Sequence, residues 1–170
     1  MLDENISRAS IPSRPRWDRA RREADKLTEP YAKPPIPVHR IAEQSGVDVI
    51  FADFGRHAQT VSGFCDFKGA KLYVNRKDNT DRQSFTIAHE LGHWILHREL
   101  FIAFPDRYPV LPRISAPNKA DPLEKEANHF AAHLLVPDRL LSPIRNAAVP
   151  ALARAFGVSA TMMGFRVRNE

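Results

Sequence analysis

The sequence contains little cysteine and no long apolar run. Cys65 is the only cysteine among 170 residues, so an internal disulfide cannot form. The N-terminal stretch MLDENISRAS has no apolar core of the kind found in signal peptides, and no segment reaches the length of a membrane span. We therefore expect a cytoplasmic protein without membrane association, with Cys65 a small strand residue rather than a nucleophile.

The sequence also lacks a strong excess of one charge sign. The net charge is +5, and the basic excess lies in residues 1–35 and 136–170, whereas residues 36–135 carry equal numbers of acidic and basic side chains. Aromatic and basic residues do not alternate as they do in a stacking platform for single-stranded nucleic acid. Direct binding of nucleic acid is therefore not expected, and the charge indicates a solvated basic surface.

The most specific chemical signal lies in residues 85–97, FTIAHELGHWILH. His89 and His93 are four residues apart, so on a helix both imidazoles project from one face and can bind a single zinc ion. Glu90 lies next to His89 and can approach a metal-bound water without being a ligand. This H-E-x-x-H spacing is typical of zinc peptidases, with Glu90 as the catalytic residue.

The surrounding pattern predicts a helix over residues 81–98. Thr80 and Gln83 have the spacing of a capping box, and no proline follows until Pro105. Gly92 is unusual inside a helix, where glycine costs about 1 kcal/mol relative to alanine. We expect a neighbouring backbone to approach closely at Gly92.

A catalytic zinc site of this type needs a third protein ligand, which we expect on a second helix in residues 121–137. Glu124 is the preferred ligand, because it shares a face with Asn128 and with small residues that would allow close helix packing. Asn128 could then orient a ligand histidine. Two alternatives remain open: Glu126 could be the ligand, and Glu124 could instead close the helix start in a capping box with Asp121.

Together these two blocks resemble the ImmA/IrrE family of metallo-endopeptidases. FTIAHELGHWILH precedes EKEANHFAAHLLVP in the order that this family shows, and the resemblance extends over residues 34–137. It implies a zincin-like fold, zinc bound by His89, His93 and Glu124, and Glu90 as the catalytic glutamate. Val136 stands where the family usually has methionine. The resemblance also implies a polypeptide substrate, a repressor or antitoxin with a helix-turn-helix domain.

The remaining pattern predicts an α+β fold with a small, mainly antiparallel, three-stranded sheet against the H-E-x-x-H helix. The strand-like runs are residues 47–53, 60–67 and 71–75. We expect an N-terminal arm and helix in residues 1–30, the metallopeptidase domain in 31–137, and helices in 138–170 packed on the same domain. The third run is the candidate edge strand for pairing with an extended substrate. It consists of Lys71, Leu72, Tyr73, Val74 and Asn75.

Other polar residues are weaker candidates. The proline-rich residues 99–120 predict a loop at the rim of the substrate cleft. Tyr108 in that loop, or His129 or His133 on the second helix, is a candidate stabiliser of the tetrahedral oxyanion. His97 continues the histidine stripe by one turn, and we expect it to orient a ligand or to pack in the core.

Three hypotheses for function follow from these patterns. The first is a zinc-dependent endopeptidase that cleaves a helix-turn-helix partner. The second is a regulatory module that binds such a partner without cleaving it, with a structural zinc. The third is DNA binding through residues 149–170, which read as helix, turn and helix but lack a row of base-reading side chains.

Overall fold

A computed structural model describes residues 12–104, 113–114 and 121–168 of the chain. Its helices and strands, in chain order, are α1 (Trp17–Thr28), α2 (Val38–Gln44), β1 (Asp48–Ala52), η2 (Gly55–His57), β2 (Val61–Asp66), β3 (Lys71–Asn75), α3 (Thr80–Ala103), β4 (Arg113–Ile114), α4 (Pro122–Leu135), α5 (Asp138–Leu141), η3 (Ser142–Ile144), α6 (Val149–Phe156) and α7 (Ala160–Arg168). The predicted α+β class is confirmed.

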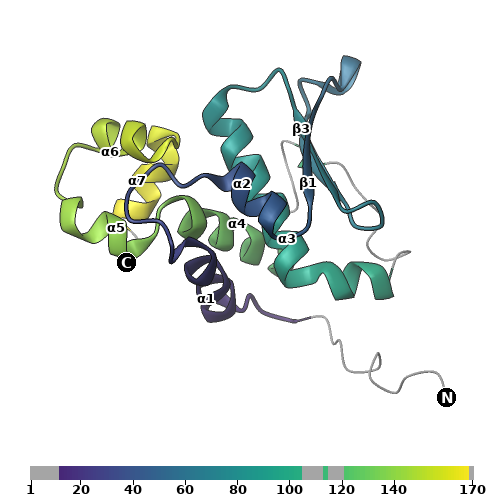
Figure 1. Cartoon of the computed structure of the whole chain (residues 1–170), viewed down its shortest axis with the longest axis horizontal. Coiled ribbons are helices and arrows are strands. Elements are labelled where there is room, and N and C mark those ends of the chain that lie inside the picture. The colour runs from purple at the N-terminus through teal and green to yellow at the C-terminus, as the bar shows by residue number, and fades with distance from the viewer. Residues whose placement is uncertain (1–11, 105–112, 115–120, 169–170) are drawn as a thin grey trace.

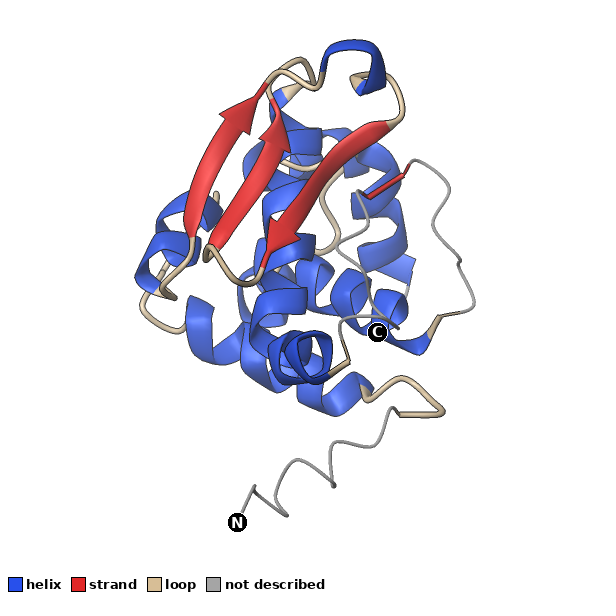
Figure 2. Cartoon of the chain, turned by 90° about the vertical axis from the view of Figure 1, so that its right-hand side faces the viewer, coloured by secondary structure: helices blue, strands red, loops and turns tan. Residues whose placement is uncertain are grey.

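The sheet and the helices form two layers. Figure 1 shows the sheet edge-on beside α3, with α5, α6 and α7 on the far side of the molecule. In Figure 2 the strands lie in front and the long helices lie behind them. One hydrophobic core joins the parts, because Ala24 of α1, Leu72 of β3, Leu91 of α3 and Met163 of α7 belong to the same buried cluster.

The sheet is mixed, and its strand order is β1-β3-β2-β4. Strand β3 pairs in parallel with β1 and antiparallel with β2, and the two-residue β4 pairs antiparallel with β2. The three predicted strands are present, but β1 runs parallel to its neighbour. The short fourth strand lies in the segment for which only a loop was predicted.

The prediction of an edge strand at Lys71, Leu72, Tyr73, Val74 and Asn75 is wrong. These residues form β3, which lies between β1 and β2 and is hydrogen-bonded on both sides. Leu72, Val74 and Asn75 are completely buried, as expected of an interior strand. A strand with both neighbours in place has no free backbone groups for a substrate peptide.

Helix α3 is longer than predicted, and its C-terminal part packs against the residue that follows β2. Its N-cap is Asn79, whose side chain accepts a hydrogen bond from the backbone of Arg82, rather than Thr80. At the other end the ring of Phe101 stacks on that of Phe67, with 4.8 Å between centroids. The helix therefore continues to Ala103, just before the first proline, Pro105.

Helices α3 and α4 come close together at Gly92. A Cβ atom there would lie 3.2 Å from the Cα of Ala127, 3.3 Å from its carbonyl oxygen and 3.0 Å from the ring of Phe130. The expected close approach of a neighbouring backbone is confirmed. This contact brings the second helix within reach of His89 and His93.

Replacing Gly92 with alanine should lower the free energy of unfolding by about 1 kcal/mol. The gain of about 1 kcal/mol in helix propensity is outweighed by overpacking, which costs roughly 1–3 kcal/mol. Gly164 of α7 is the matched control, because its added Cβ would meet only the end of Arg168 at 3.9 Å. Gly164→Ala should therefore stabilise the protein by up to about 1 kcal/mol. Urea unfolding of both variants checks the prediction, and equal gains in stability would contradict it.

The C-terminal helix α7 uses its basic residue Arg166 within the fold. Gly157, with a φ of 67°, ends α6 in the left-handed conformation that glycine adopts readily. Arg166 of α7 is 6% exposed and donates hydrogen bonds to the carbonyl oxygen of Val136 and the carboxylate of Asp138. Arg166 is thus not available to a DNA backbone.

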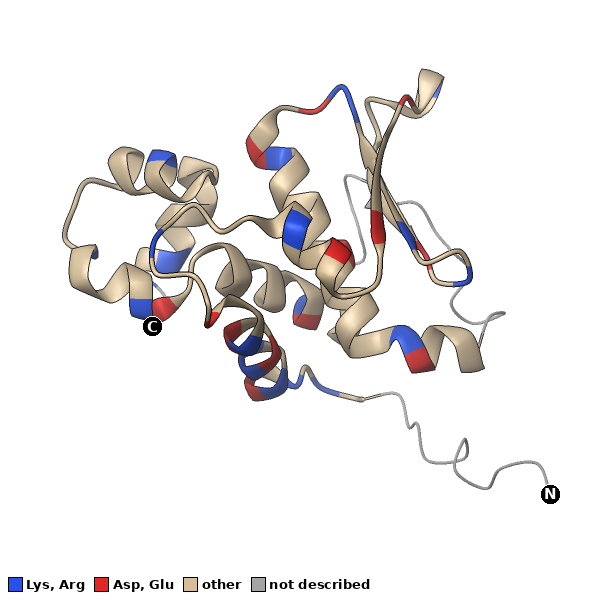
Figure 3. Ribbon diagram, viewed as in Figure 1, with Lys and Arg blue, Asp and Glu red and all other residues tan. Residues whose placement is uncertain are grey.

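Charges of both signs alternate along α1, as Figure 3 shows. Arg21 contacts Asp25 and Asp138, and Lys26 contacts Glu23.

Within the described ranges, no helix combines the length and the apolar character that crossing a membrane requires.

Candidate metal centre

Helices α3 and α4 bring two histidines and one glutamate together. His93 Nε2 lies 3.2 Å from His89 Nε2 and 2.9 Å from Glu124 Oε1, and His89 Nε2 lies 3.2 Å from Glu124 Oε2. The potential ligand atoms of all three residues lie within 4.8 Å of one another. His89 and His93 are 1% and 6% exposed, so water does not replace these contacts freely.

The outer nitrogens of both imidazoles have defined partners. His89 Nδ1 lies 2.8 Å from Asn128 Oδ1, and His93 Nδ1 lies 2.9 Å from Nδ1 of His97. The oxygen of Asn128 only accepts, so the proton of His89 belongs on Nδ1. The Nε2 lone pair of His89 then points toward the cluster, in the orientation that metal binding requires.

The inner atoms of the cluster need a cation. Glu124 Oε2 is buried and has no hydrogen-bond partner among the residues that the structure describes, although His89 Nε2 lies 3.2 Å away. Two imidazole lone pairs and a carboxylate that face one another in a buried site repel each other. A divalent metal ion would remove this repulsion, and two imidazoles with one carboxylate form a donor set that zinc commonly takes.

The metal-free site already favours an ionised glutamate. Burial alone would raise the pKa of Glu124. When His89 and His93 also carry protons on Nε2 in the metal-free protein, their hydrogen bonds and charge outweigh burial and hold the pKa of Glu124 well below the ordinary value. Glu124 is therefore a carboxylate at neutral pH, as a metal ligand must be.

Asp121, rather than Glu124, caps the start of α4. The side chain of Asp121 accepts a hydrogen bond from the backbone of Leu123, at 2.8 Å. Glu126, the alternative ligand, lies outside the cluster and contacts His97 and Arg16 instead. Of the two glutamates, the structure thus brings only Glu124 to the two histidines.

Glu90 follows His89 on α3 and is 5% exposed. Its nearness to the sheet is indicated by its effect on Cys65, a residue of β2. Burial raises the pKa of the Cys65 thiol, and the nearby charge of Glu90 raises it further. Glu90 therefore lies near enough to Cys65 for its charge to act on the thiol, and Cys65 is not a reactive thiol.

The two described candidate oxyanion stabilisers, His129 and His133, are not brought to this cluster. Tyr108 lies outside the described residues, as does most of the predicted loop at the cleft rim. The ring of His129 packs against Trp17 of α1, with 5.0 Å between centroids. His133 Nδ1 lies 3.7 Å from Asp138 of α5. Both histidines thus occupy a different face of α4 from Glu124 and Asn128.

His133 should make stability depend on pH. Burial, with the nearby charge of Arg166, lowers its pKa to about 3 from the ordinary 6.5. Between these two values the unfolded chain binds more protons than the native protein, so the free energy of unfolding falls as the pH falls below about 6.5. At pH 5 the loss is on the order of 2 kcal/mol.

The variant His133→Leu should remove this part of the pH dependence. Urea unfolding at pH 7 and pH 5, with chelator present throughout, compares it with the parent. His97 and the other titrating groups are common to both proteins, so the difference reports on His133. An equal loss of stability in both proteins between the two pH values would contradict the prediction.

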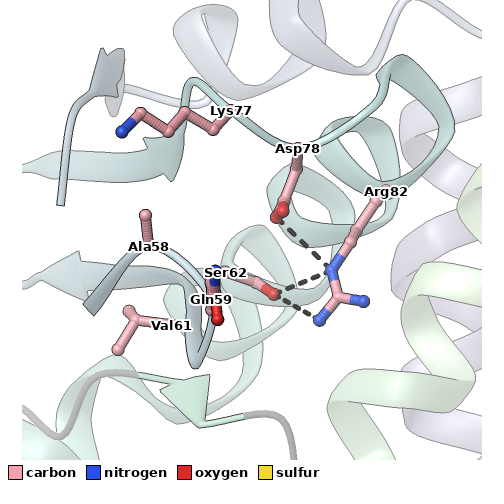
Figure 4. A pocket seen from close by; sticks show the side chains of 7 residues that line it. All are labelled: Ala58, Gln59, Val61, Ser62, Lys77, Asp78 and Arg82. Carbon is pink, nitrogen blue, oxygen red and sulfur yellow. Dashed lines mark hydrogen bonds and ion pairs between the residues drawn. The ribbon is translucent and has the colours of Figure 1, made fainter. Parts of the chain in front are cut away.

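A hollow of about 460 Å³ lies near the start of α3, two helical turns before His89. Figure 4 shows that the guanidinium of Arg82 points into it and that Lys77 points away. Arg82 contacts Ser62 Oγ at 2.9 Å and the carboxylate of Asp78 at 3.3 Å. With its charge already paired and no histidine in the lining, this hollow is not a second metal site.

The helix pair, its histidine and glutamate cluster and the adjacent mixed sheet define a domain of the metallopeptidase type. The chain belongs to the family described as Peptidase_M78, the IrrE N-terminal-like domain, whose pattern matches residues 42–168. The resemblance to the ImmA/IrrE family is confirmed.

Two relatives illustrate the range of this similarity. The chain is 37% identical to Metallopeptidase ImmA of Bacillus subtilis (strain 168) over 71 residues, which are 42% of this chain and 37% of ImmA. Its fold resembles that of a Mycobacterium tuberculosis transcriptional regulator, with a TM-score of 0.62 and 17% identity over 88% of this chain and 46% of the regulator. The chain thus matches less than half the length of either relative.

Proposed function

We propose that the protein is a zinc-dependent metalloendopeptidase, with His89, His93 and Glu124 as zinc ligands and Glu90 as the catalytic glutamate. The observation that carries the proposal is the convergence of the three ligand residues, two of them buried, with the buried Glu90 next to His89 on α3. When bound, zinc would polarise the scissile carbonyl and lower the pKa of a bound water.

The protein side chains supply the remaining chemistry. Glu90 removes a proton from the attacking water and passes it to the leaving amine. The amide bond is thereby hydrolysed to a carboxylate and an amine. Asn128 keeps His89 in the orientation in which Nε2 faces the site. Burial of the cluster strengthens the electrostatic interactions on which proton transfer depends.

The outer side of β2 is the surface that we propose for the substrate backbone. Strand β4 pairs with Val61 and Gly63, and no other described strand pairs with the outer side of residues 64–66. This part of β2 lies along α3, where Gly63 meets Thr86 and Cys65 lies near Glu90. A peptide added here would gain backbone hydrogen bonds and pass close to Glu90.

The proposed substrate is a repressor or antitoxin with a helix-turn-helix domain. The family resemblance supports this proposal, and the name of the relative, Metallopeptidase ImmA, is consistent with a peptidase. The competing hypothesis is a module that binds such a partner around a structural zinc without cleaving it.

The test is to incubate the purified protein with the helix-turn-helix protein encoded nearest to its gene. We expect a shortened partner that disappears with chelator and returns with added zinc. A partner that binds but stays at full length, with zinc present in stoichiometric amount, would overturn the peptidase proposal and favour the binding module.

A further inference from the structure

A chain of buried hydrogen bonds leads from His93 to the start of the N-terminal helix. His93 Nδ1 lies 2.9 Å from His97 Nδ1, and His97 Nε2 lies 2.8 Å from Glu126 Oε2. His97 and Glu126 are both completely buried. Glu126 then accepts three hydrogen bonds from Arg16, namely from the backbone N, Nε and Nη2, at 2.8, 2.9 and 3.1 Å.

With His97 neutral, these contacts have one consistent arrangement of protons. The three donors of Arg16 keep Glu126 ionised, and a carboxylate only accepts hydrogen bonds. His97 must therefore donate from Nε2 to Glu126 Oε2. A neutral His97 then has its lone pair on Nδ1 and accepts the proton of His93 Nδ1. His93 is left with a lone pair on Nε2, the atom that faces Glu124 and His89.

The electrostatics agree with this arrangement. His97 is completely buried, and burial disfavours the charged form of an imidazole. The guanidinium of Arg16 compensates the buried charge of Glu126, which would otherwise be strongly unfavourable.

We propose that His97, Glu126 and Arg16 are positioning residues that hold His93 in its metal-binding tautomer and orientation. The N-terminal segment thereby becomes part of the metal centre. Arg16 lies outside residues 42–168, which match the family pattern, and is 110 residues from Glu126 in the chain. The inference rests on the proposed zinc centre and adds a requirement that the ligands alone do not imply.

The experiment measures the zinc dissociation constant of the full chain by competition with a chromogenic chelator. Outer partners of a ligand histidine typically change metal affinity about 10- to 100-fold. We expect a loss in this range for His97→Leu and a smaller loss for Arg16→Ala, since Glu126 retains the backbone donor. His97→Gln, whose amide can both accept and donate, should recover part of the affinity.

Arg19→Ala is the matched control. Arg19 lies on α1 and reaches α3, where it donates to the carbonyl oxygen of Leu96 at 3.0 Å. Its charge interacts with that of Glu126, but among the described contacts no hydrogen bond or ion pair joins it to Glu126 or His97. Its zinc affinity should equal that of the parent. The melting temperature of each metal-free variant separates a loss of folding from a loss of zinc binding. If His97→Leu does not fold, Arg16→Ala provides the test of the positioning role.

The outcomes separate this inference from the proposed function. Weaker zinc binding by folded His97→Leu or Arg16→Ala, with Arg19→Ala unchanged, supports the positioning role. Folded variants with parental zinc affinity overturn it and leave the zinc centre intact. A parent without zinc affinity overturns the proposed function itself, and the positioning role with it.

Discussion

Replacing Glu90 with glutamine should leave zinc binding unchanged and slow peptide cleavage by about 10²- to 10⁴-fold, the usual contribution of a positioned general base. Glutamine has nearly the same shape but cannot take a proton from water. Because Glu90 is 5% exposed, the isosteric change also avoids a cavity. The measurement is the single-turnover rate of partner cleavage beside the zinc content of the same preparation.

The control is Glu43→Gln on α2, an exposed glutamate that contacts only His39 among its described ion pairs. It should cleave at the parental rate. If Glu90→Gln also cleaved at that rate, the assigned role would be refuted. If Glu90→Gln had lost its zinc, the low rate would point to a ligand role for Glu90 instead.

Replacing Glu124 with alanine should weaken zinc binding by more than the roughly 100-fold upper range for an outer partner, since a ligand itself is removed. It should also abolish the stabilisation by zinc, which for the parent amounts to about 2.7 kcal/mol at a free zinc concentration of 100 times the dissociation constant. Thermal unfolding with and without zinc measures both effects.

Glu126→Ala is the informative comparison, because the two glutamates are two residues apart on α4. Its loss of affinity should be smaller than that of Glu124→Ala, since Glu126 acts through His97. The reverse order would move the third ligand to Glu126 and contradict the arrangement of α3 and α4 described above.

The local parts of the candidate site could be predicted from the sequence. His89 and His93 are one helical turn apart, as are Glu124 and Asn128, so each pair shares a helical face whatever the rest of the chain does. Gly92 predicted where the two helices approach. These features depend on helical periodicity within short segments.

The long-range parts could not be predicted in the same way. The position of β3 between β1 and β2 depends on the pairing of β3 with β1, which is not its neighbour in the chain, and the residue pattern of a short buried strand does not say which strands lie beside it. The extension of α3 depends on Phe101 meeting Phe67. The contacts of His97 depend on Glu126 and, through it, on Arg16, which local spacing does not connect.

The burial of Cys65 has a practical consequence. At 4% exposure and with a raised pKa, the native thiol should not react with alkylating reagents unless the sheet opens. The rate at which Cys65 is labelled therefore measures how often the sheet opens, and mass spectrometry can follow it without any substitution. A fluorophore could be attached selectively to a cysteine introduced at a surface position, because Cys65 would stay unlabelled in the folded protein.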